Sequence, residues 1–503
     1  MNPIYLDGQS LTLEDFIKVT RENYPVQLSP KAIQQVETSR QQVETFLAQE
    51  RIIYGITTGF GKFCDVHISS EQLEQLQHNL IVSHACGIGE PLSIPETRGV
   101  LLLRANALAK GFSGIRLETL NLLIDLLNHQ IHPVIPEKGS LGASGDLAPL
   151  SHMVLVMLGE GEAFYQGKRL TGAQALQQAQ LQPLTLQAKE GLALINGTQV
   201  LTSIGAHALY DAQNLAIQAD LIASLTVEAL NGITDAFDPR IQEVRPHQGQ
   251  IDTARNLRTF LKDSEMTSHQ GELRVQDAYS IRCIPQIHGA SKDSFNYIQE
   301  KIEIEMNAVT DNPIIFNDTQ EAISGGNFHG QPLALPFDFL KIAIAELANV
   351  SERRLERLVN PHLSDLPAFL SENGGLNSGF MVVQYAAAAL VSENKILAHP
   401  ASVDSIPSSA NQEDHVSMGT IAARHARDIL DNSRKVLAME LLSACQGIDL
   451  RGKKRLGKVT EQAYQHVRQH LPKVEEDTIM YPLINTAEEL LKSATFLQII
   501  HQQ

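Results

Sequence analysis

The sequence predicts a mainly α-helical protein, in which a turn-rich N-terminal globular region precedes a long central helical bundle. Apolar residues recur at three- and four-residue spacing over long stretches, which is typical of helices that bury one face. The stretch 197–237 contains no proline, and strand-like patterns are short and few. These observations predict the fold class before any motif is considered.

The first clear helix is predicted to begin near residue 117 and to end before Pro133. Its apolar residues follow helical spacing: Leu117, Leu120, Ile124, Leu127 and Ile131. A small hairpin is predicted over 163–172, with its turn around Gly167. The first 195 residues are richer in turns and glycines than the next block. We therefore place a boundary near Asn196, between an N-terminal region (1–195) and a long-helix bundle with the C-terminal region (196–503).

The proline-free stretch predicts one helix of about 30 residues or more, packed lengthwise against other helices. Its apolar residues repeat every seven positions: Leu201, Ala208, Leu215, Ile222 and Ala229. Another long helix is predicted to begin near Asp338, an N-cap candidate after Pro336, and to end before Pro361. The SERRLER segment on that helix is predicted to form a solvated or ion-paired face.

Composition excludes several classes of protein. The chain has 503 residues and a net charge of −17, from 40 basic and 57 acidic residues, which argues against nucleic acid as the main partner. No apolar run approaches the roughly 18 residues of a membrane span, and the N-terminus shows no secretory signal, so we expect a cytoplasmic protein. The four cysteines are scattered and predict neither a disulfide framework nor a zinc site: Cys64, Cys86, Cys283 and Cys445. We expect no metal.

Several segments are dense in glycine and in polar residues that packing would not select. They are YGITTGFG (54–61), NLIVSHACGIG (79–89), LINGTQ (194–199), RVQDAYSIRC (274–283), DNPIIF (311–316), SGGNFHG (324–330) and VDSIPSSANQEDHVSMG (403–419). Taken singly, each fits a plain loop or a buried polar side chain. Together they supply tyrosines, an arginine, amides and a His and Glu pair, which suit a small zwitterionic substrate with a polar ring.

A further stretch, GSLGASGDLAPLSH (139–152), places Ala143, Ser144 and Gly145 in a row between Gly142 and Asp146, just before an expected helix. Serine and aspartate commonly cap helices, and glycine permits turns with positive φ, so a simple turn before a helix is one interpretation. A serine-hydrolase elbow needs glycine two positions on either side of the serine. Gly142 satisfies this for Ser144, but residue 146 is Asp, so the sequence does not support that interpretation.

Four motifs, in this order and spacing, resemble the aromatic amino-acid ammonia-lyase family: GSLGASGDLAPL, VQDAYSIRC, ISGGNFHG and SIPSSANQEDH. The resemblance covers nearly the whole chain and is closest to the members that act on L-histidine. It implies elimination of ammonia from L-histidine to give trans-urocanate, the first step of histidine degradation. It also implies a homotetramer whose active sites draw residues from three subunits.

The resemblance implies that Ala143, Ser144 and Gly145 cyclise into an electrophilic methylidene imidazolone, so that no external cofactor is needed. The Gly145 nitrogen must attack the Ala143 carbonyl carbon, and glycine has no Cβ to block that approach. Serine is required because its β-hydroxyl leaves as water. By resemblance, Asp146 and Phe328 assist the cyclisation through proton handling and strain. Capture of the substrate through its amine and capture through its imidazole ring both remain open.

Residue roles follow from the same resemblance. Tyr279 is expected to remove the β-proton, and a nearby cation such as Arg282 would favour its phenolate form. Arg282 is expected to clamp the substrate carboxylate, for which its planar fork is suited. Tyr54 and Gln276 are expected to contact the amino and carboxylate end of the substrate. Asn196 is expected to hydrogen-bond the prosthetic ring or the carboxylate.

His84 and Glu413 are expected to bind the imidazole ring, although Glu413 could instead accept a proton from the amine. Relatives that act on tyrosine or phenylalanine typically carry His-Leu or Phe-Leu where this chain has Ser83-His84. The second hypothesis is a tyrosine or phenylalanine lyase, or an aminomutase, and Ser83-His84 and Glu413 argue against it. The third hypothesis is a non-catalytic helical scaffold. The intact Ala143-Ser144-Gly145 sequence argues against a scaffold.

Overall fold

A computed structural model describes residues 2–59, 61 and 68–502, so Cys64 lies outside the described residues. The chain forms two compact units. The first unit comprises Met1–His207, Gln299–Asp338 and Pro400–Arg424, and the second comprises Ala208–Ile298, Phe339–His399 and His425–Gln503. A single boundary near Asn196 does not describe this division, because two later segments return to the first unit. The mainly helical class predicted from the sequence is confirmed.

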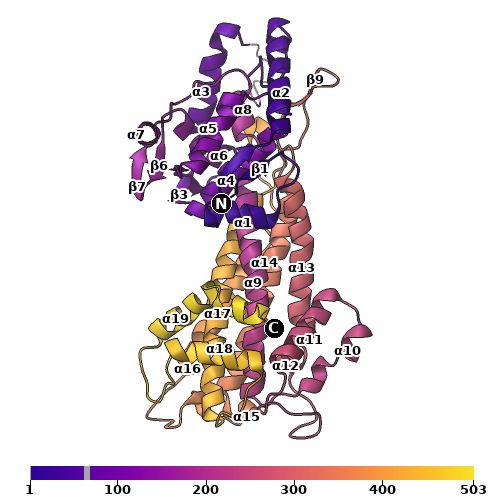
Figure 1. Ribbon diagram of the computed structural model, residues 1–503, viewed down its shortest axis with the longest axis vertical. Helices are drawn as coiled ribbons and strands as arrows, with labels where there is room; N and C mark the ends of the chain where they lie inside the picture. Colours follow the sequence, from indigo (N-terminus) through magenta and orange to yellow (C-terminus); the bar gives the residue numbers. More distant parts are fainter. Residues whose placement is uncertain (1, 60, 62–67, 503) are drawn as a thin grey trace. The chain divides into compact units, whose positions relative to one another are not determined.

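In the first unit a buried helix, α4, packs against other helices and small sheets (Figure 1). Nearly every side chain of α4 is buried, and the buried set includes the polar side chains of Glu96, Arg98, Arg104 and Asn106. The predicted hairpin is confirmed as β6 and β7, and positive φ angles at Gln166 and Gly167 form its tight turn. The helices of this unit are α1 (Leu13–Glu22), α2 (Pro30–Ala48), α3 (Leu73–His84), α4 (Ile94–Ala109), α5 (Leu117–Asn128), α6 (Leu147–Met157), α7 (Gly172–Gln178) and α8 (Glu190–Ile195).

The strands form small sheets of two or three strands. β1 and β2 are parallel, and the other pairs are antiparallel: β3 with β5, β4 with β6, β6 with β7, and β8 with β9. The strand bounds are β1 (Ile4–Leu6), β2 (Val26–Leu28), β3 (Ile88–Pro91), β4 (His132–Pro133), β5 (Pro136–Lys138), β6 (Glu162–Tyr165), β7 (Lys168–Thr171), β8 (Ile314–Phe316) and β9 (Glu321–Ile323).

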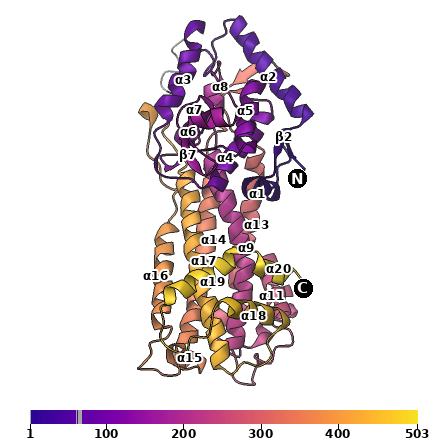
Figure 2. The same ribbon diagram turned by 60° about the vertical axis from the view of Figure 1, so that its left-hand side comes forward.

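Four long helices extend through both units: α9 (Gln199–Ala229), α13 (Ile284–Met306), α14 (Gln331–Val359) and α17 (Gly419–Leu450). The predicted helix of about 30 residues is confirmed as α9, which has 31 residues, and its heptad positions are buried. In the second unit these helices lie side by side (Figures 1 and 2). The remaining helices of that unit are α10 (Pro239–Glu243), α11 (Gln248–Phe260), α12 (Tyr279–Arg282), α15 (Pro361–Ser364), α16 (Met381–Leu397), α18 (Lys458–His470), α19 (Met480–Lys492) and α20 (Thr495–His501).

Buried charges join these long helices in the second unit. Arg354 on α14 pairs with Glu440 on α17 at 2.6 Å, and both side chains are fully buried. Asp220 on α9 accepts a hydrogen bond from His288 on α13 at 2.8 Å. The SERRLER segment is therefore ion-paired, but Arg354 lies in the core and not on a solvated face. Among the described residues, no helix combines the length and apolar character that a membrane span requires.

The predicted start of α14 at Asp338 is wrong, because the helix begins at Gln331 and contains Pro336. A proline near a helix start removes only one backbone hydrogen bond, here to the carbonyl of Pro332, and the surrounding packing tolerates that loss. Asp338 does not cap this helix. Its carboxylate accepts the backbone N–H groups of Ala401 and Ser402 at 3.0 and 2.8 Å, and so holds the loop that follows α16.

Candidate active site

The first unit contains a cavity of about 1190 Å³. Its walls come from the glycine-rich and polar segments that stand far apart in the sequence: 54–61, the end of α3, the tripeptide, residue 196, 312–329 and 409–415. Most of the residues predicted to form the site meet here. Those that line the cavity are Tyr54, His84, Ala143, Ser144, Asn196, Phe328 and Glu413.

The tripeptide is sharply bent and pressed against a second backbone segment. Gly145 has a φ of 72°, and a Cβ added to it would lie 2.2 Å from the carbonyl oxygen of Gly197. Only glycine fits at this position. The next residue, Asp146, donates its backbone N–H to the same Gly197 carbonyl at 2.7 Å. The turn at Gly197 therefore forms a wall that keeps the Ala143–Gly145 backbone bent.

The side chain of Asp146 is fully buried and holds the tripeptide segment to its neighbours. One carboxylate oxygen accepts the hydroxyls of Ser140 and Thr420 at 2.7 and 2.5 Å. The other accepts the backbone N–H groups of Val200 and Leu201 at 2.9 Å each, at the start of α9. Burial raises the pKa of Asp146, and these hydrogen bonds oppose the increase.

Asn196 connects the tripeptide to the core. Its Nδ2 donates to the carbonyl oxygen of Ser144 at 2.9 Å. Its Oδ1 is buried and has no hydrogen-bond partner among the described residues. An unpaired buried amide oxygen is costly unless a ligand group satisfies it. The Oδ1 of Asn196 is therefore available to accept a hydrogen bond at the cavity that Ala143 and Ser144 also line.

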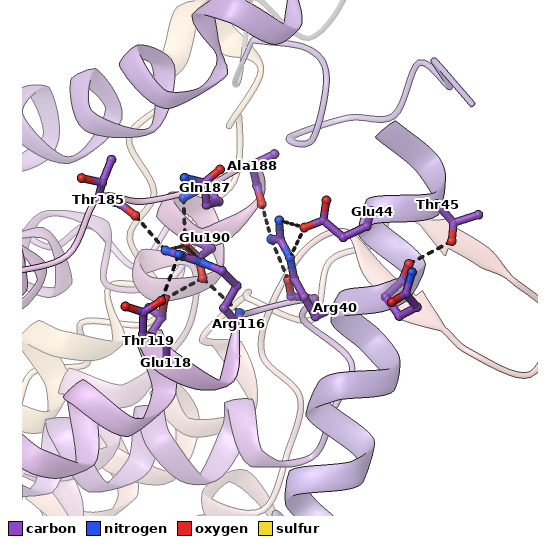
Figure 3. Close-up of polar contacts among 12 residues, drawn as sticks. Arg40, Glu44, Thr45, Arg116, Glu118, Thr119, Thr185, Gln187, Ala188 and Glu190 are labelled. Atoms are coloured by element: carbon purple, nitrogen blue, oxygen red, sulfur yellow. Dashed lines mark hydrogen bonds and ion pairs between the residues drawn. The ribbon is translucent and has the colours of Figure 1, made fainter. Parts of the chain in front are cut away.

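The helix that leads to Asn196 is held by a buried network (Figure 3). Glu190, the first residue of α8, accepts hydrogen bonds from Arg116 at 2.7 Å, Thr119 at 2.7 Å and the backbone N–H of Gln187 at 2.8 Å. Arg40 donates to the carbonyl of Ala188 at 3.0 Å from a different helix. A carboxylate at a helix N-terminus is favourable, and here it also fixes the direction of α8 toward the cavity.

Glu413 and His84 are polar side chains that line the cavity together with Ala143 and Ser144. Ser144 Oγ donates to one oxygen of Glu413 at 2.8 Å, and Ser408 Oγ donates to the other at 2.9 Å. His84 is the last residue of α3, and its Nδ1 lies 3.0 Å from the hydroxyl of Ser83. Burial lowers the pKa of His84, a hydrogen bond with the Leu80 backbone and the charge of Glu413 partly oppose this, and the net shift favours the neutral imidazole.

Tyr54 and Phe328 are the remaining predicted residues that line the cavity. The hydroxyl of Tyr54 accepts the backbone N–H of Gly61 at 3.3 Å. Both side chains are half-buried and line the cavity. The catalytic and cofactor-supporting roles of Tyr54 and Phe328 stay predictions.

Five predicted residues do not line the cavity; Gly145 and Asp146 belong to the first unit, and the other three do not. Gln276, Tyr279 and Arg282 belong to the second unit, on and just before the short helix α12. The Tyr279 side chain is 69% exposed, and the guanidinium of Arg282 lies over its ring, 4.7 Å from the centroid. Asp277 fixes this segment, because its carboxylate accepts the backbone N–H of Ile233 at 2.6 Å.

The cavity also includes side chains to which the sequence analysis gave no role. Asn312 receives the backbone N–H of Gly325 at 2.7 Å, and His329 stacks on His415 at 5.8 Å between ring centroids. These residues belong to polar segments of the sequence, 311–316, 324–330 and 403–419. No local sequence pattern shows which of these segments contact one another. Among the described residues, no three His, Cys, Asp or Glu side chains are grouped to hold a metal ion.

Comparisons with known proteins show which family the chain resembles in sequence. The model of the aromatic amino acid lyase family matches residues 11–469. The chain is 61% identical over 502 residues to a histidine ammonia-lyase from Alkaliphilus oremlandii, covering 100% of this chain and 99% of that one. It is 56% identical over 503 residues to a histidine ammonia-lyase from Caldanaerobacter subterraneus, covering 100% and 99%.

Solved structures show the same relationship. A histidine ammonia-lyase from Trypanosoma cruzi superposes with a TM-score of 0.93 at 43% identity, covering 100% of this chain and 95% of that one. A tyrosine aminomutase from Streptomyces globisporus superposes with a TM-score of 0.96 at 38% identity, covering 100% and 99%. The similarity to enzymes extends over the whole chain, so the hypothesis of a non-catalytic scaffold is set aside. The chain is an enzyme and belongs to the aromatic amino acid lyase family.

Proposed function

We propose that this enzyme eliminates ammonia from L-histidine to give trans-urocanate, and so catalyses the first step of histidine degradation. One observation carries the choice of substrate: Glu413 lines the same cavity as His84 and lies 2.8 Å from Ser144 Oγ. Relatives named histidine ammonia-lyase, at 61% and 56% identity, support the same choice.

We propose that Ala143, Ser144 and Gly145 cyclise to a methylidene imidazolone, which supplies an electrophilic alkene and makes an external cofactor unnecessary. The residues present fit this group. Gly145 is bent and has no space for a Cβ, and Asn196 offers a buried, unpaired Oδ1 beside the tripeptide. Asp146, buried behind the tripeptide, is suited to hold the backbone and to exchange a proton during cyclisation.

His84 and Glu413 bind the imidazole ring of the substrate in this proposal. An imidazole has one N–H donor and one nitrogen acceptor, so it can donate to the Glu413 carboxylate and form a second hydrogen bond with neutral His84. A phenyl ring would leave the Glu413 carboxylate without a partner in a partly buried site, which is costly. The cavity therefore favours histidine over phenylalanine.

The remaining substrate contacts are proposed to come from other copies of the chain. Tyr279 removes the β-proton, Arg282 clamps the carboxylate, and Gln276 together with Tyr54 contacts the amino and carboxylate end. A homotetramer with shared active sites would bring these residues to the cavity. In the second unit, apolar side chains are exposed on α13, α14 and α16, as expected of helices that meet other subunits: Tyr297, Phe339, Ile342, Val382, Tyr385 and Ile396.

We also propose that the enzyme works in the cytoplasm and binds neither nucleic acid nor membranes. Cys86, Cys283 and Cys445 are free thiols, as is usual in proteins of reducing compartments.

A tyrosine or phenylalanine lyase, or an aminomutase, is the second candidate, because a tyrosine aminomutase shares this fold. An assay of the purified protein with L-histidine, L-tyrosine and L-phenylalanine separates the candidates, since each elimination product is a conjugated acrylate with its own ultraviolet band. We expect a rise with histidine alone. A rise with tyrosine or phenylalanine would retain the chemistry and overturn the roles of His84 and Glu413.

Ser144→Ala tests the prosthetic group itself. We expect this variant to fold, to lose nearly all activity and to lack the mass deficit of two water molecules in the peptide that carries residues 143–145. Wild-type protein should show that deficit. Full turnover in Ser144→Ala, or wild-type protein that is active without the deficit, would refute the proposal.

A further inference from the structure

Helix α4 carries a fully buried arginine directly behind the tripeptide site. Arg104 has no exposed surface, and one terminal nitrogen, Nη1, donates two hydrogen bonds. It reaches the backbone carbonyl of Asn196 at 2.7 Å and the side-chain oxygen of Gln199 at 2.9 Å. One guanidinium therefore joins the end of α8 to the beginning of α9.

The turn that Arg104 holds is the same turn that bends the tripeptide. Asn196 donates to the carbonyl of Ser144, and the carbonyl of Gly197 accepts the backbone N–H of Asp146. The contact is close, because a Cβ added to Gly197 would lie 2.5 Å from Arg104 Nη1. A movement of the guanidinium would therefore displace both groups that touch the tripeptide.

Arg104 remains charged at this buried position. Burial lowers its pKa to about 10, and the charge of Asp311 opposes that decrease. Asp311 is itself paired with Lys189 at 2.6 Å, and both side chains are fully buried. The Nε and the second terminal nitrogen of Arg104 have no hydrogen-bond partner in the described part of the chain. A buried cation without a dedicated carboxylate is costly, so stability alone does not account for it.

We propose that Arg104 is a positioning residue for the prosthetic-group site: it fixes the Asn196–Gly197 turn against the tripeptide and directs the Asn196 amide at the Ser144 carbonyl. This inference rests on the proposed function. Ring closure forms a bond between the Gly145 nitrogen and the Ala143 carbonyl carbon. The Ala143 oxygen leaves as water with the amide hydrogens of Ser144 and Gly145, and the Ser144 hydroxyl leaves as water with its Cα hydrogen.

The same helix provides a matched control. Arg98 is 2% exposed and its pKa is also lowered to about 10, because burial acts on it in the same way. Its guanidinium donates to the backbone carbonyls of Val19 and Leu127 at 2.6 and 3.1 Å, and it has no bond to the tripeptide turn. Arg98→Met therefore removes another buried cation from α4 without removing a hydrogen bond to Asn196.

The experiment compares wild-type protein, Arg104→Met, Arg104→Lys and Arg98→Met, each purified as the folded assembly. Intact mass gives the fraction of chains with the two-water deficit over a time course, and kinetics give kcat per cyclised chain and KM. We expect Arg104→Met to cyclise more slowly and to lose about tenfold in kcat, a typical effect of removing a partner that orients a reacting group. KM should not change, since Arg104 does not line the cavity. Arg104→Lys should recover part of the loss, because it keeps the charge but not the planar fork.

Equal cyclisation and equal kcat in Arg104→Met and Arg98→Met, whether both match wild type or both fall together, would overturn the positioning role. If Arg104→Met does not fold, Arg104→Lys and Arg98→Lys are compared by the same criterion. Wild-type protein without the two-water deficit would instead refute the proposed function, so the two failures are distinguishable.

Discussion

Replacing Asp146 tests how the tripeptide site is held together. Asp146→Ala removes the acceptor of the Val200 and Leu201 backbone N–H groups at the start of α9, which are buried. An unsatisfied buried donor costs about 1–3 kcal/mol, so the two together predict a loss of about 4 kcal/mol in the free energy of unfolding. The hydroxyls of Ser140 and Thr420 lose less, because they lie 3.1 Å apart and can bond each other.

Asp146→Asn separates the hydrogen bonds from the charge. Its amide oxygen can still accept the two backbone N–H groups, and its NH₂ can donate to the two hydroxyls. Because burial raises the pKa of Asp146, the folded state holds its proton more tightly than the unfolded state does. Ionisation therefore reduces stability as the pH rises through the interval between the unfolded and folded pKa values. The neutral asparagine should lie within about 1 kcal/mol of wild type at pH 7.

Urea denaturation at pH 7 and a fixed chain concentration, followed by circular dichroism, measures both variants. We expect Asp146→Asn to stay within about 1 kcal/mol of wild type and Asp146→Ala to lie well below both. If Asp146→Asn lost as much stability as Asp146→Ala, the charge of Asp146 and not its hydrogen-bonding geometry would hold the two segments together. Intact mass of the same samples reports cyclisation, and we expect Asp146→Ala to retain less of the two-water deficit than Asp146→Asn.

Two further changes follow from the structure. Gly197→Ala places a methyl group 2.4 Å from Gln199 Oε1 and 2.5 Å from Arg104 Nη1. We expect the free energy of unfolding to fall by about 3 kcal/mol or more, and cyclisation to be blocked. A thermal unfolding midpoint equal to that of wild type would contradict this expectation. His132 is buried, and burial together with the charge of Arg98 lowers its pKa to about 4. The unfolded chain therefore binds a proton that the folded chain does not, and stability falls by about 3 kcal/mol as the pH drops from about 6.5 to 4. His132→Phe should flatten this part of the pH–stability curve, and an unchanged slope would show that His132 is not responsible.

The sequence predicted the helices whose pattern repeats over many residues. The heptad along α9 and the apolar face of α5 are local patterns, so they can be recognised without knowledge of the partner helices. Part of the cavity lining was also predictable, because the Ala143–Gly145 tripeptide and the motif around Glu413 are each continuous in the sequence. The start of α14 was not predictable, since its first turn and Pro336 are tolerated only in the packed protein.

The pattern of residues along the chain is enough to predict the helical class, to single out the Ala143-Ser144-Gly145 tripeptide and to identify the polar segments that accompany it. Which of those segments meet depends on packing: Ser144 contacts Glu413 within the first unit, whereas Tyr279 and Arg282 belong to the second unit. Packing also buries Arg104 against the carbonyl of Asn196, although nothing local in the sequence distinguishes it from Arg98 in the same helix. The physical reason is that helical periodicity is stored in neighbouring residues, whereas hydrogen bonds between segments depend on positions that only the packed chain fixes.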